Sequence, residues 1–371
     1  MDGRHPLAGD GHVAAVDLGG TKILAAIVGP SGQIVSRAKR STGKDHRPAA
    51  VLDRIADCVR QAAQAADVEP GQLGGVGIGA PGPVDAERGA LRTAPNLEGW
   101  QDVPVVAELE RRLGVPVALD NDVRVAVIAE GAAGAGRGCR DWIALWPGTG
   151  IGGGVVLGGK VVTGVNNSAG ELGHMTVKAG GPKCGCGGRG HLEAMASRSA
   201  IMRWIQKRID AGDKTSLTRK VGKDVRDARS DDLRKAFDAG DKLVTKAIER
   251  GAKYLAIGIA NMANAVNPEL VVLGGGLIEA MGEPFVRMVE KNVRKHTLKA
   301  ATADLRVVAS QLGDDAGITG AALLARRLAS PPSAAPDAGT RRRGDAESAG
   351  GAAQRPRAAT PGGEEGGARG G

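Results

Sequence analysis

Apolar residues recur along the chain with two periods, and their alternation predicts a mixed α/β fold. Short apolar runs of strand length end in glycines, as in VAAVDLGG (Val13 to Gly20) and ELVVLGGGL (Glu269 to Leu277). Longer segments with apolar residues at helical spacing lie between such runs, at Pro48 to Val68, Val103 to Gly114 and Leu233 to Val266. The sequence therefore predicts strands that alternate with helices.

One strand–turn–strand unit is predicted twice. A strand, a glycine turn and a second strand follow one another from Val13 and again from Trp142. This repetition indicates an internal duplication. A final helix is expected over Asp314 to Ala329. The aperiodic Pro-, Ala- and Gly-rich stretch at 330–371 predicts a disordered tail.

Composition and charge narrow the class of function. The 371 residues carry a net charge of +9, and only 2 % are aromatic, which disfavours a base-stacking surface for nucleic acid. The interspersed cations between Arg198 and Arg250 suggest a solvated helical face or an attraction for small anions. The opening residues lack the apolar run of a signal peptide, and no stretch has the length of a membrane helix. Cys58 and Cys139 stand alone, so we expect no disulfide framework and a cytoplasmic protein.

Glycine clusters supply the first candidate chemistry. DLGGTK (Asp17 to Lys22) places a carboxylate at a strand end, followed by backbone N–H groups that can hold phosphate oxygens. Asp17 can position hydrated Mg²⁺, while Thr21 and Lys22 can contact phosphate. This turn alone fits a simple hairpin equally well. Two further clusters, PGTGIGGG (Pro147 to Gly154) and GGGL (Gly274 to Leu277), also follow strands. Three such turns suit two phosphate loops and a flat platform for adenosine.

An ordered set of motifs resembles the ROK family of bacterial sugar kinases and sugar-responsive repressors. The motifs are VDLGGTK, GAPGPVD, APNL, LDND, PGTGIGGG, AGELGH and CGCGGRGHLE, and the resemblance extends over residues 13–328. It implies duplicated actin-like (ribonuclease H-like) ATPase domains with the active site in an interdomain cleft. The N-terminal domain is expected at 12–120, completed by the helix at 314–329. The C-terminal domain is expected at 121–313, with a zinc loop at 174–193.

The resemblance also implies ATP with Mg²⁺ as the phosphoryl donor. The residues expected to bind ATP are Asp17, Gly19, Gly20, Thr21, Lys22, Gly148, Thr149, Gly150, Gly152, Gly274, Gly275 and Gly276.

LDND (Leu119 to Asp122) carries the expected catalytic base. Phosphoryl transfer to a hydroxyl requires positioning and a carboxylate that accepts the hydroxyl proton. By resemblance, Asp122 is this base toward the sugar 6-hydroxyl, and Asn121 hydrogen-bonds a ring hydroxyl. The polar cluster could instead cap the following helix, a duty that Asp120 is expected to serve.

The remaining sugar ligands are expected in separate parts of the chain. A carboxylate suits a polyol because it accepts two hydroxyls at once. The residues that the resemblance assigns to sugar binding are Gly82, Asn96, Asn121, Asp122, Glu171, His174 and Glu193. For Glu171 and Glu193, a solvated surface position is the alternative.

Two of the four cysteines lie in the loop KCGCGGRGHLE. Cys184 and Cys186, with His174 and His191, offer four ligands that suit tetrahedral Zn²⁺. ROK sugar kinases carry a structural zinc with one His and three Cys, so His191 stands where a Cys is usual. We expect zinc to bind with His191 as a ligand; the alternative is a surface His191 with weak or lost zinc. A site closed by four ligands would orient His174 and Glu193 instead of activating water.

The motifs together favour an ATP-dependent hexose kinase, and analogy with the family favours glucose. N-acetylhexosamine kinase and fructokinase are alternatives, because the motifs bind features common to all hexoses. A sugar-sensing repressor is the non-enzymatic alternative, disfavoured because the first strand begins near His12 and leaves no room for a helix-turn-helix. Expected partners are a hexose and ATP, without nucleic acid or membrane, in a homodimer or homotetramer.

Overall fold

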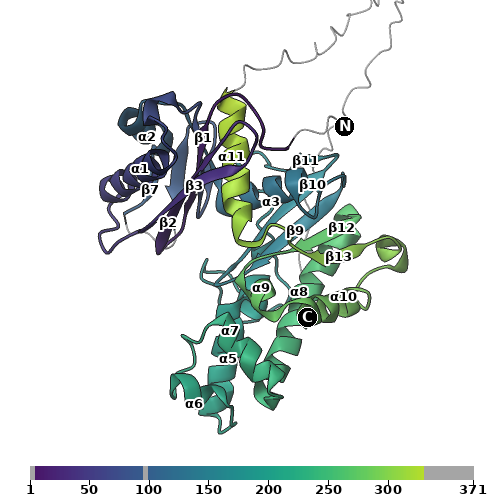
Figure 1. The fold of residues 1–371 in the computed structure, drawn as a ribbon. Coiled ribbons are helices and arrows are strands. Elements are labelled where there is room, and N and C mark those ends of the chain that lie inside the picture. Colours follow the sequence, from purple (N-terminus) through teal and green to yellow (C-terminus); the bar gives the residue numbers. More distant parts are fainter. Residues whose placement is uncertain (1–4, 95–98, 330–371) are drawn as a thin grey trace, which may run out of the picture. The chain divides into compact units, whose positions relative to one another are not determined.

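The computed structural model describes residues 5–94 and 99–329, and its first five-stranded sheet contains the N-terminal strands (Figure 1). Its strands are β1 (Val13–Leu18), β2 (Lys22–Val28), β3 (Ile34–Ser41), β4 (Val76–Ala80) and β8 (Val117–Asn121), in the order β3-β2-β1-β4-β8. The first three strands are antiparallel, while β4 pairs in parallel with both β1 and β8. The predicted tail at 330–371 and the predicted sugar ligand Asn96 lie outside the described residues.

The second sheet repeats this design. Its strands are β9 (Trp142–Pro147), β10 (Ile151–Leu157), β11 (Lys160–Val161), β12 (Leu270–Leu273) and β13 (Arg306–Ala309), in the order β11-β10-β9-β12-β13. A hairpin again precedes parallel pairing of β9 with β12 and of β12 with β13. The predicted duplication is confirmed, because strands in corresponding positions have the same order and the same directions.

The remaining elements connect or cover these sheets. A small sheet contains β5 (Val84–Asp85), β6 (Ala90–Thr93) and β7 (Gln101–Val103). The helices are α1 (Pro48–Ala65), α2 (Val105–Leu113), α3 (Asp122–Ala133), α4 (Leu192–Ala196), α5 (Arg198–Asp210), α6 (Leu217–Val221), α7 (Ser230–Asp238), α8 (Lys242–Val266), α9 (Gly276–Met281), α10 (Glu283–Val293) and α11 (Ala316–Ala329). None of the helices in the described part of the chain has the length and apolar character needed to cross a membrane.

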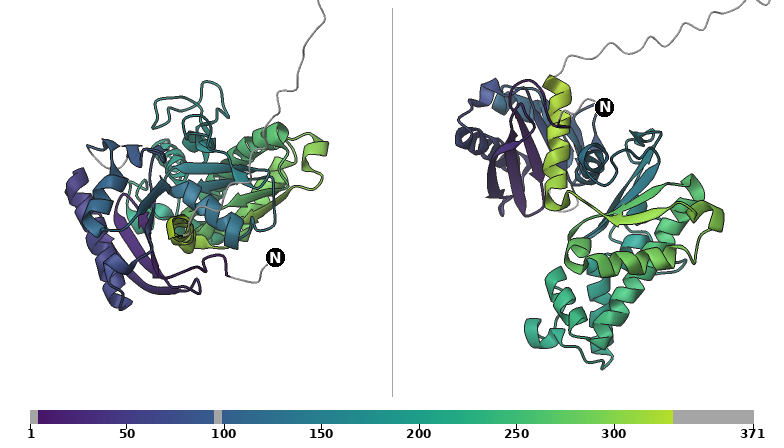
Figure 2. Two further views of the ribbon diagram at one scale, coloured as in Figure 1. Left: turned by 90° about the horizontal axis from the view of Figure 1, so that it is seen from above. Right: turned by 45° about the vertical axis from the view of Figure 1, so that its right-hand side comes forward.

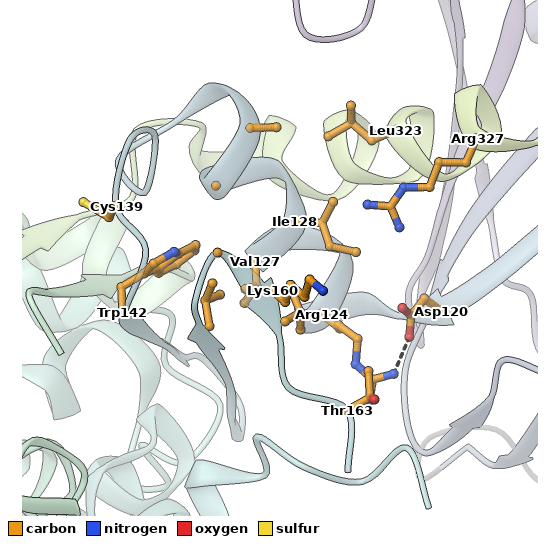
Figure 3. A pocket seen from close by; sticks show the side chains of 15 residues that line it. Asp120, Arg124, Val127, Ile128, Cys139, Trp142, Lys160, Thr163, Leu323 and Arg327 are labelled. Carbon is orange, nitrogen blue, oxygen red and sulfur yellow. Dashed lines mark hydrogen bonds and ion pairs between the residues drawn. The ribbon is translucent and has the colours of Figure 1, made fainter. Parts of the chain in front are cut away.

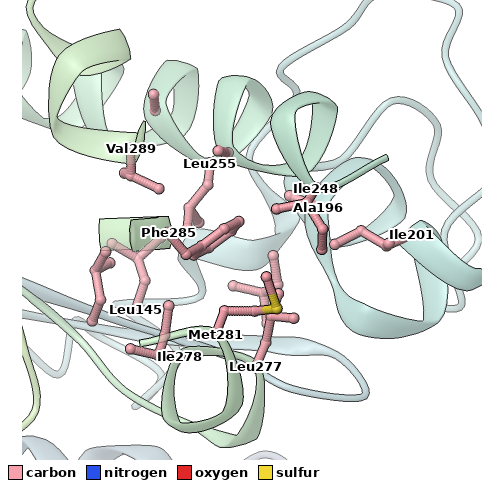
Figure 4. Close-up of a cluster of buried hydrophobic side chains, with 14 of the residues drawn as sticks. Leu145, Ala196, Ile201, Ile248, Leu255, Leu277, Ile278, Met281, Phe285 and Val289 are labelled. Carbon is pink, nitrogen blue, oxygen red and sulfur yellow. The ribbon is translucent and has the colours of Figure 1, made fainter. Parts of the chain in front are cut away.

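Burial explains why the sheet strands read as continuous apolar runs. Val13 to Val16 in β1 are fully buried, because β1 lies between β2 and β4 inside the sheet, with α1 and α11 packed against it. In the second half, Phe285 of α10 packs with Leu145, Leu255 and Met281 in one large cluster (Figure 4). Fully burying side chains of this size contributes about 1.5–3 kcal/mol each.

Helix α3 contributes to two cores at once. Val125 packs with Ile318 and Ala322 of α11 against the first sheet, whereas Val127 packs with Trp142 against the second sheet. Helix α11 therefore follows the second sheet in sequence but packs on β1, as Figures 1 and 2 show. This packing agrees with the expected return of the last helix to the N-terminal half; the domain boundaries stay a prediction.

Candidate functional site

Most of the predicted sugar ligands line one pocket of about 570 Å³. The pocket brings together the loop after β4, the β8–α3 junction, the β9–β10 turn and the cysteine-containing loop. Predicted site residues in its wall are Gly82, Asn121, Asp122, Gly148, Thr149, Gly150, Gly152, Glu171, His174, Cys186 and Glu193. Positions separated by more than 100 residues thus meet in a single site, which we call the sugar pocket.

Asp122 is a partly buried carboxylate in the wall of the sugar pocket. It is the first residue of α3, and its Oδ1 accepts hydrogen bonds from the Val123 N–H at 2.8 Å and from Asn121 Nδ2 at 3.0 Å. Burial raises the pKa of Asp122 to about 7, and the negative charges of Asp17 and Glu171 act in the same direction. A carboxylate with a pKa near neutrality is suited to accept a proton from a hydroxyl.

Asn121, not Asp120, caps α3. The Asn121 side-chain oxygen accepts from the N–H groups of Val123 and Arg124, at 3.0 and 3.1 Å. Its Nδ2 donates to the Gly82 carbonyl at 3.1 Å, as well as to Asp122. The expectation that Asp120 serves as the cap is therefore wrong, because Asp120 is engaged in an ion pair with Arg124 at 2.8 Å. Contact between Asn121 and a sugar hydroxyl stays a prediction.

The β9–β10 turn forms one wall of the sugar pocket. The Gly148 N–H donates to the Gly150 carbonyl at 2.9 Å, which closes the turn. A side chain at Gly152 is excluded, because a Cβ there would lie 2.3 Å from Val123 Cγ2 on α3. Arg198, at the start of α5, donates from its backbone N–H to the Gly148 carbonyl at 2.9 Å and from its guanidinium to Thr149 Oγ1 at 3.2 Å. Sequence reasoning missed Arg198, since nothing beside it in the chain marks it.

The β1–β2 turn holds the other predicted phosphate ligands. The Gly19 N–H donates to the Lys22 carbonyl at 2.8 Å, and Thr42 Oγ1 donates to the Gly19 carbonyl at 2.8 Å. Burial raises the pKa of Asp17, and the Lys22 ammonium opposes this effect. Asp17, Gly19, Gly20, Thr21 and Lys22 do not line the sugar pocket, although the charge of Asp17 acts on Asp122.

The third glycine cluster packs beside the β9–β10 turn. Gly274 leaves no room for a side chain, because a Cβ there would lie 2.5 Å from the Trp146 ring. Gly275 adopts φ +83°, a conformation that favours glycine, and Gly276 begins α9. Trp146 itself lines the sugar pocket and was not predicted as a site residue. In the sequence, a tryptophan at the end of a predicted strand could have indicated this position in the site.

The two glutamates have different surroundings. Glu193 Oε2 accepts from the Ile151 N–H at 3.0 Å and ties the cysteine loop to the β9–β10 turn, so it is not a solvated surface residue. Glu171 is half exposed, and its Oε2 lies 3.9 Å from His174 Nε2. Both carboxylates line the sugar pocket, where they can accept hydroxyl protons in hydrogen bonds.

Four predicted metal ligands converge beside the sugar pocket. One ligand atom from each of His174, Cys184, Cys186 and His191 lies within 4.8 Å of the other three. Nδ1 of His174 lies 3.8 Å from Cys184 Sγ, and Nδ1 of His191 lies 3.2 Å from Cys186 Sγ. Four atoms around zinc at 2.0–2.3 Å would have spacings of about 3–4 Å. These two distances match that range, His191 is turned toward the other ligands, and a tetrahedral zinc would fit once the wider spacings, of up to 4.8 Å, shorten.

Cys184 and His174 connect this cluster to the sugar pocket. Cys184 is buried, and its burial raises the pKa of the thiol to about 11. A bound cation would reverse that effect by favouring the thiolate. His174 turns Nδ1 toward Cys184 and Nε2 toward Glu171, so its two ring nitrogens face the metal cluster and the sugar pocket respectively.

Comparison with known proteins gives consistent matches over most of the chain. The family model described as "ROK family" matches residues 13–328. A glucokinase of Thermotoga maritima is 37 % identical over 83 % of this chain and 95 % of its own length. The solved structure of a ROK family glucokinase from Streptomyces griseus, in complex with glucose and AMPPNP, has a TM-score of 0.74 at 34 % identity, with 85 % and 100 % of the two chains covered. A ROK family transcriptional regulator has a TM-score of 0.76 at 28 % identity, covering 86 % of this chain and 78 % of its own.

Proposed function

Because this chain belongs to the ROK family, we propose that it is an ATP-dependent glucokinase, which transfers the γ-phosphoryl group of ATP to the 6-hydroxyl of glucose. The observation that carries this proposal is Asp122, a partly buried carboxylate with a pKa near neutrality in the same pocket as the β9–β10 glycine turn. The curated glucokinases at 33–37 % identity support the choice of substrate.

Asp122 would accept the proton of the 6-hydroxyl as the oxygen attacks phosphorus. Its carboxylate is held by the Val123 N–H and by Asn121, so little reorientation is required during the reaction. The cap at Asn121 fixes both the start of α3 and the Gly82 loop. Glu171, His174 and Glu193 would bind the other sugar hydroxyls, with Asn96 as a further predicted ligand.

The glycine turns would hold the phosphates of ATP. Gly148, Thr149, Gly150 and Gly152 line the same pocket as Asp122, and Arg198 holds this turn in place. Asp17 would hold hydrated Mg²⁺, and the bound ion would neutralise part of the phosphate charge. Gly19, Gly20, Thr21 and Lys22 are proposed phosphate ligands, and Gly274, Gly275 and Gly276 are the proposed platform for adenosine.

The cysteine and histidine cluster would hold a structural zinc. All four positions of a tetrahedral ion would be occupied by protein, so the ion would not bind a reacting water. Its effect would pass through His174, whose Nε2 faces Glu171 in the sugar pocket. Zinc would therefore lower the KM for sugar without changing the chemistry.

A parallel assay of five sugars tests the proposed function. ADP release from Mg-ATP is measured with glucose, mannose, fructose, N-acetylglucosamine and N-acetylmannosamine. Glucose is expected to give the largest kcat/KM. A larger kcat/KM for another of these sugars would identify the protein as one of the related hexose kinases. No ADP release with any of the five sugars, from folded and zinc-loaded protein, would favour a non-catalytic sugar sensor. Light scattering on the same sample tests the proposed homodimer or homotetramer.

A further inference from the structure

A second pocket, of about 520 Å³, lies along α3 and contains none of the residues proposed to bind sugar, ATP or zinc. Figure 3 shows side chains that line it from several elements, among them Arg124, Val127 and Ile128 from α3, Lys160 from β11, and Leu323 and Arg327 from α11. We call it the α3 pocket. Its volume falls within the range of small-molecule sites.

Positive charge dominates the polar half of the α3 pocket. Arg124 donates to Asp120 at 2.8 Å, and the two side chains are only 9 % and 13 % exposed. Lys160 and Arg327 also line the pocket, and neither forms an ion pair with any residue in the described ranges. The lining of the pocket thus contains three cationic side chains and one carboxylate. Cations gathered around a concave, partly apolar surface attract an anion more strongly than isolated surface cations do.

The other half of the α3 pocket is apolar. It is lined by Val127 and Trp142, which are almost completely buried, and by Ile128, Val156 and Leu323. Figure 3 shows Trp142 and Cys139 at one end of the pocket and Arg327 and Asp120 at the other. A ligand that fills both halves needs an anionic group and an apolar or planar body.

We propose that the α3 pocket is a binding site for a small organic anion, a phosphate monoester or a carboxylate, whose charge is held by Lys160 and Arg327. The apolar body of the ligand would lie against Ile128 and Leu323, which are only partly buried, over the buried side chains of Val127 and Trp142. Charge-assisted hydrogen bonds from a guanidinium and an ammonium suit either anion.

The hydrogen bonds of Arg124 connect the α3 pocket to the sugar pocket. Its Nη1 binds Asp120, whose Oδ1 also accepts the Asn121 N–H at 2.7 Å. Its Nη2 donates to the Asn167 carbonyl at 2.6 Å, and the next residue, Ser168, lines the sugar pocket. A bound anion that attracts the Arg124 guanidinium would weaken its hydrogen bonds to Asp120 and to the Asn167 carbonyl. We therefore expect occupancy of the α3 pocket to change the affinity for sugar, an effect that rests on the proposed function.

Calorimetric titration with phenyl phosphate tests the site, because this probe joins an anion to a planar apolar body. The double variant Lys160→Ala/Arg327→Ala removes the charge, and Ala132→Leu fills the pocket while leaving all three cations in place. Each is expected to weaken binding about tenfold or more. The control Lys207→Ala removes an exposed cation that lines a different pocket, and it should leave binding unchanged.

Two comparisons define the ligand and its place. Benzoate should bind as well, inorganic phosphate about tenfold more weakly, and neutral benzyl alcohol undetectably. Bound phenyl phosphate should slow the alkylation of Cys139, which lies at the end of the pocket. Peptide mass spectrometry measures the rate of this alkylation. Equal affinity of all variants for phenyl phosphate, or an unprotected Cys139, would overturn the site.

The coupling is tested separately by the dissociation constant for glucose, measured with and without saturating phenyl phosphate. A change of about threefold or more is expected. An unchanged constant would overturn the coupling. Absence of kinase activity would instead contradict the proposed function, since the titrations and the Cys139 readout do not depend on turnover.

Discussion

At the scale of single residues, Asp122 links the fold to the proposed chemistry. Burial stabilises the protonated form of this carboxyl group and raises its pKa to about 7, while a general base must be ionised. Activity should therefore rise with pH and reach a plateau above about 7. The measurement is kcat/KM for glucose between pH 5.5 and 9, with ATP saturating. A profile that is flat from pH 5.5 to 7 would contradict this assignment.

Glu130 is a fully buried carboxylate that stabilises the fold. It is fully buried near the end of α3 and accepts hydrogen bonds from the Ala135 N–H at 2.7 Å, the Ser310 hydroxyl at 2.5 Å and the Leu312 N–H at 3.0 Å. It thereby fastens α3 to the segment that leads from β13 to α11.

Glu130→Gln should lower the free energy of unfolding by about 1.5–3 kcal/mol, because either orientation of the amide would turn its NH2 group toward a backbone N–H, that of Leu312 or that of Ala135. The measurement is urea unfolding. Glu290→Gln is the matched control: Glu290 pairs with Arg294 on the surface, so its loss should cost less than about 1 kcal/mol. Equal stability of Glu130→Gln and the native protein would contradict the described hydrogen bonds.

Individual residues were predictable from sequence only where a motif marks them. Asp122 and the four metal-cluster residues stand in recognisable spacings, and the structure brings the metal-cluster residues together. Arg198 and Glu130 carry no local signal, because their partners lie at Thr149 and Ser310, far along the chain. The choice between Asp120 and Asn121 as the cap depended on Arg124, which attracts the Asp120 carboxylate.

At the scale of elements, the cysteine loop depends on His191 for its fourth metal ligand. The ring lies against Gly188, where a Cβ would approach it to 2.3 Å, so the loop is folded tightly around this side chain. His191→Ala should reduce bound zinc well below one per chain and raise the KM for glucose, with little change in kcat.

Zinc content by atomic absorption and steady-state kinetics measure these two effects. Lys183→Ala, in the same loop but exposed, is the control and should keep full zinc. His191→Cys should restore zinc binding, since a thiolate is an equally good ligand. Full zinc content in His191→Ala would remove His191 from the ligand set.

The contact between α3 and α11 depends on a glycine. A Cβ at Gly320 would lie 1.9 Å from the Val125 carbonyl oxygen, so the helices must move apart to admit it. Gly320→Ala should therefore lower stability by about 1–3 kcal/mol, although alanine favours helix. Thermal unfolding gives the measurement. Gly71→Ala, at a position with open space around it, should be nearly neutral, and the same result at Gly320 would contradict the packing.

Most elements could be predicted from the periodicity of apolar residues. The two hairpins and α1 follow directly from runs that end in glycine or continue at helical spacing. The segment Leu233–Val266 is divided because Asp241 accepts hydrogen bonds from the N–H groups of Leu243 and Val244 and begins α8. The expected last helix from Asp314 starts instead as a 3-10 turn over Gly313–Asp315, with α11 from Ala316.

At the scale of the whole molecule, the site depends on a duplicated fold in which two helices link the halves: α11 returns to the first sheet, and α3 packs against both sheets. Asp122 stands at the end of the first sheet, while the β9–β10 turn belongs to the second, and α3 packs with both. The duplication could be predicted from the repeated glycine turn. The return of α11 to the first sheet was expected only from the family resemblance, because its contacts with β1 join residues about 300 positions apart. The α3 pocket could not be predicted, since it arises where elements that are distant in sequence meet.

The central claim is that Asp122 serves as the base of a sugar kinase, and Asp122→Asn tests it most directly. Kcat and the dissociation constant for glucose are measured for this variant and for the native protein at pH 8. At this pH the Asp122 carboxylate of the native protein is ionised at a cost in stability, because its pKa is raised, so the neutral asparagine should not unfold the protein. The account predicts that kcat falls by about 10²–10⁴-fold while glucose binding changes little. A variant that keeps near-native kcat would show that another group accepts the proton.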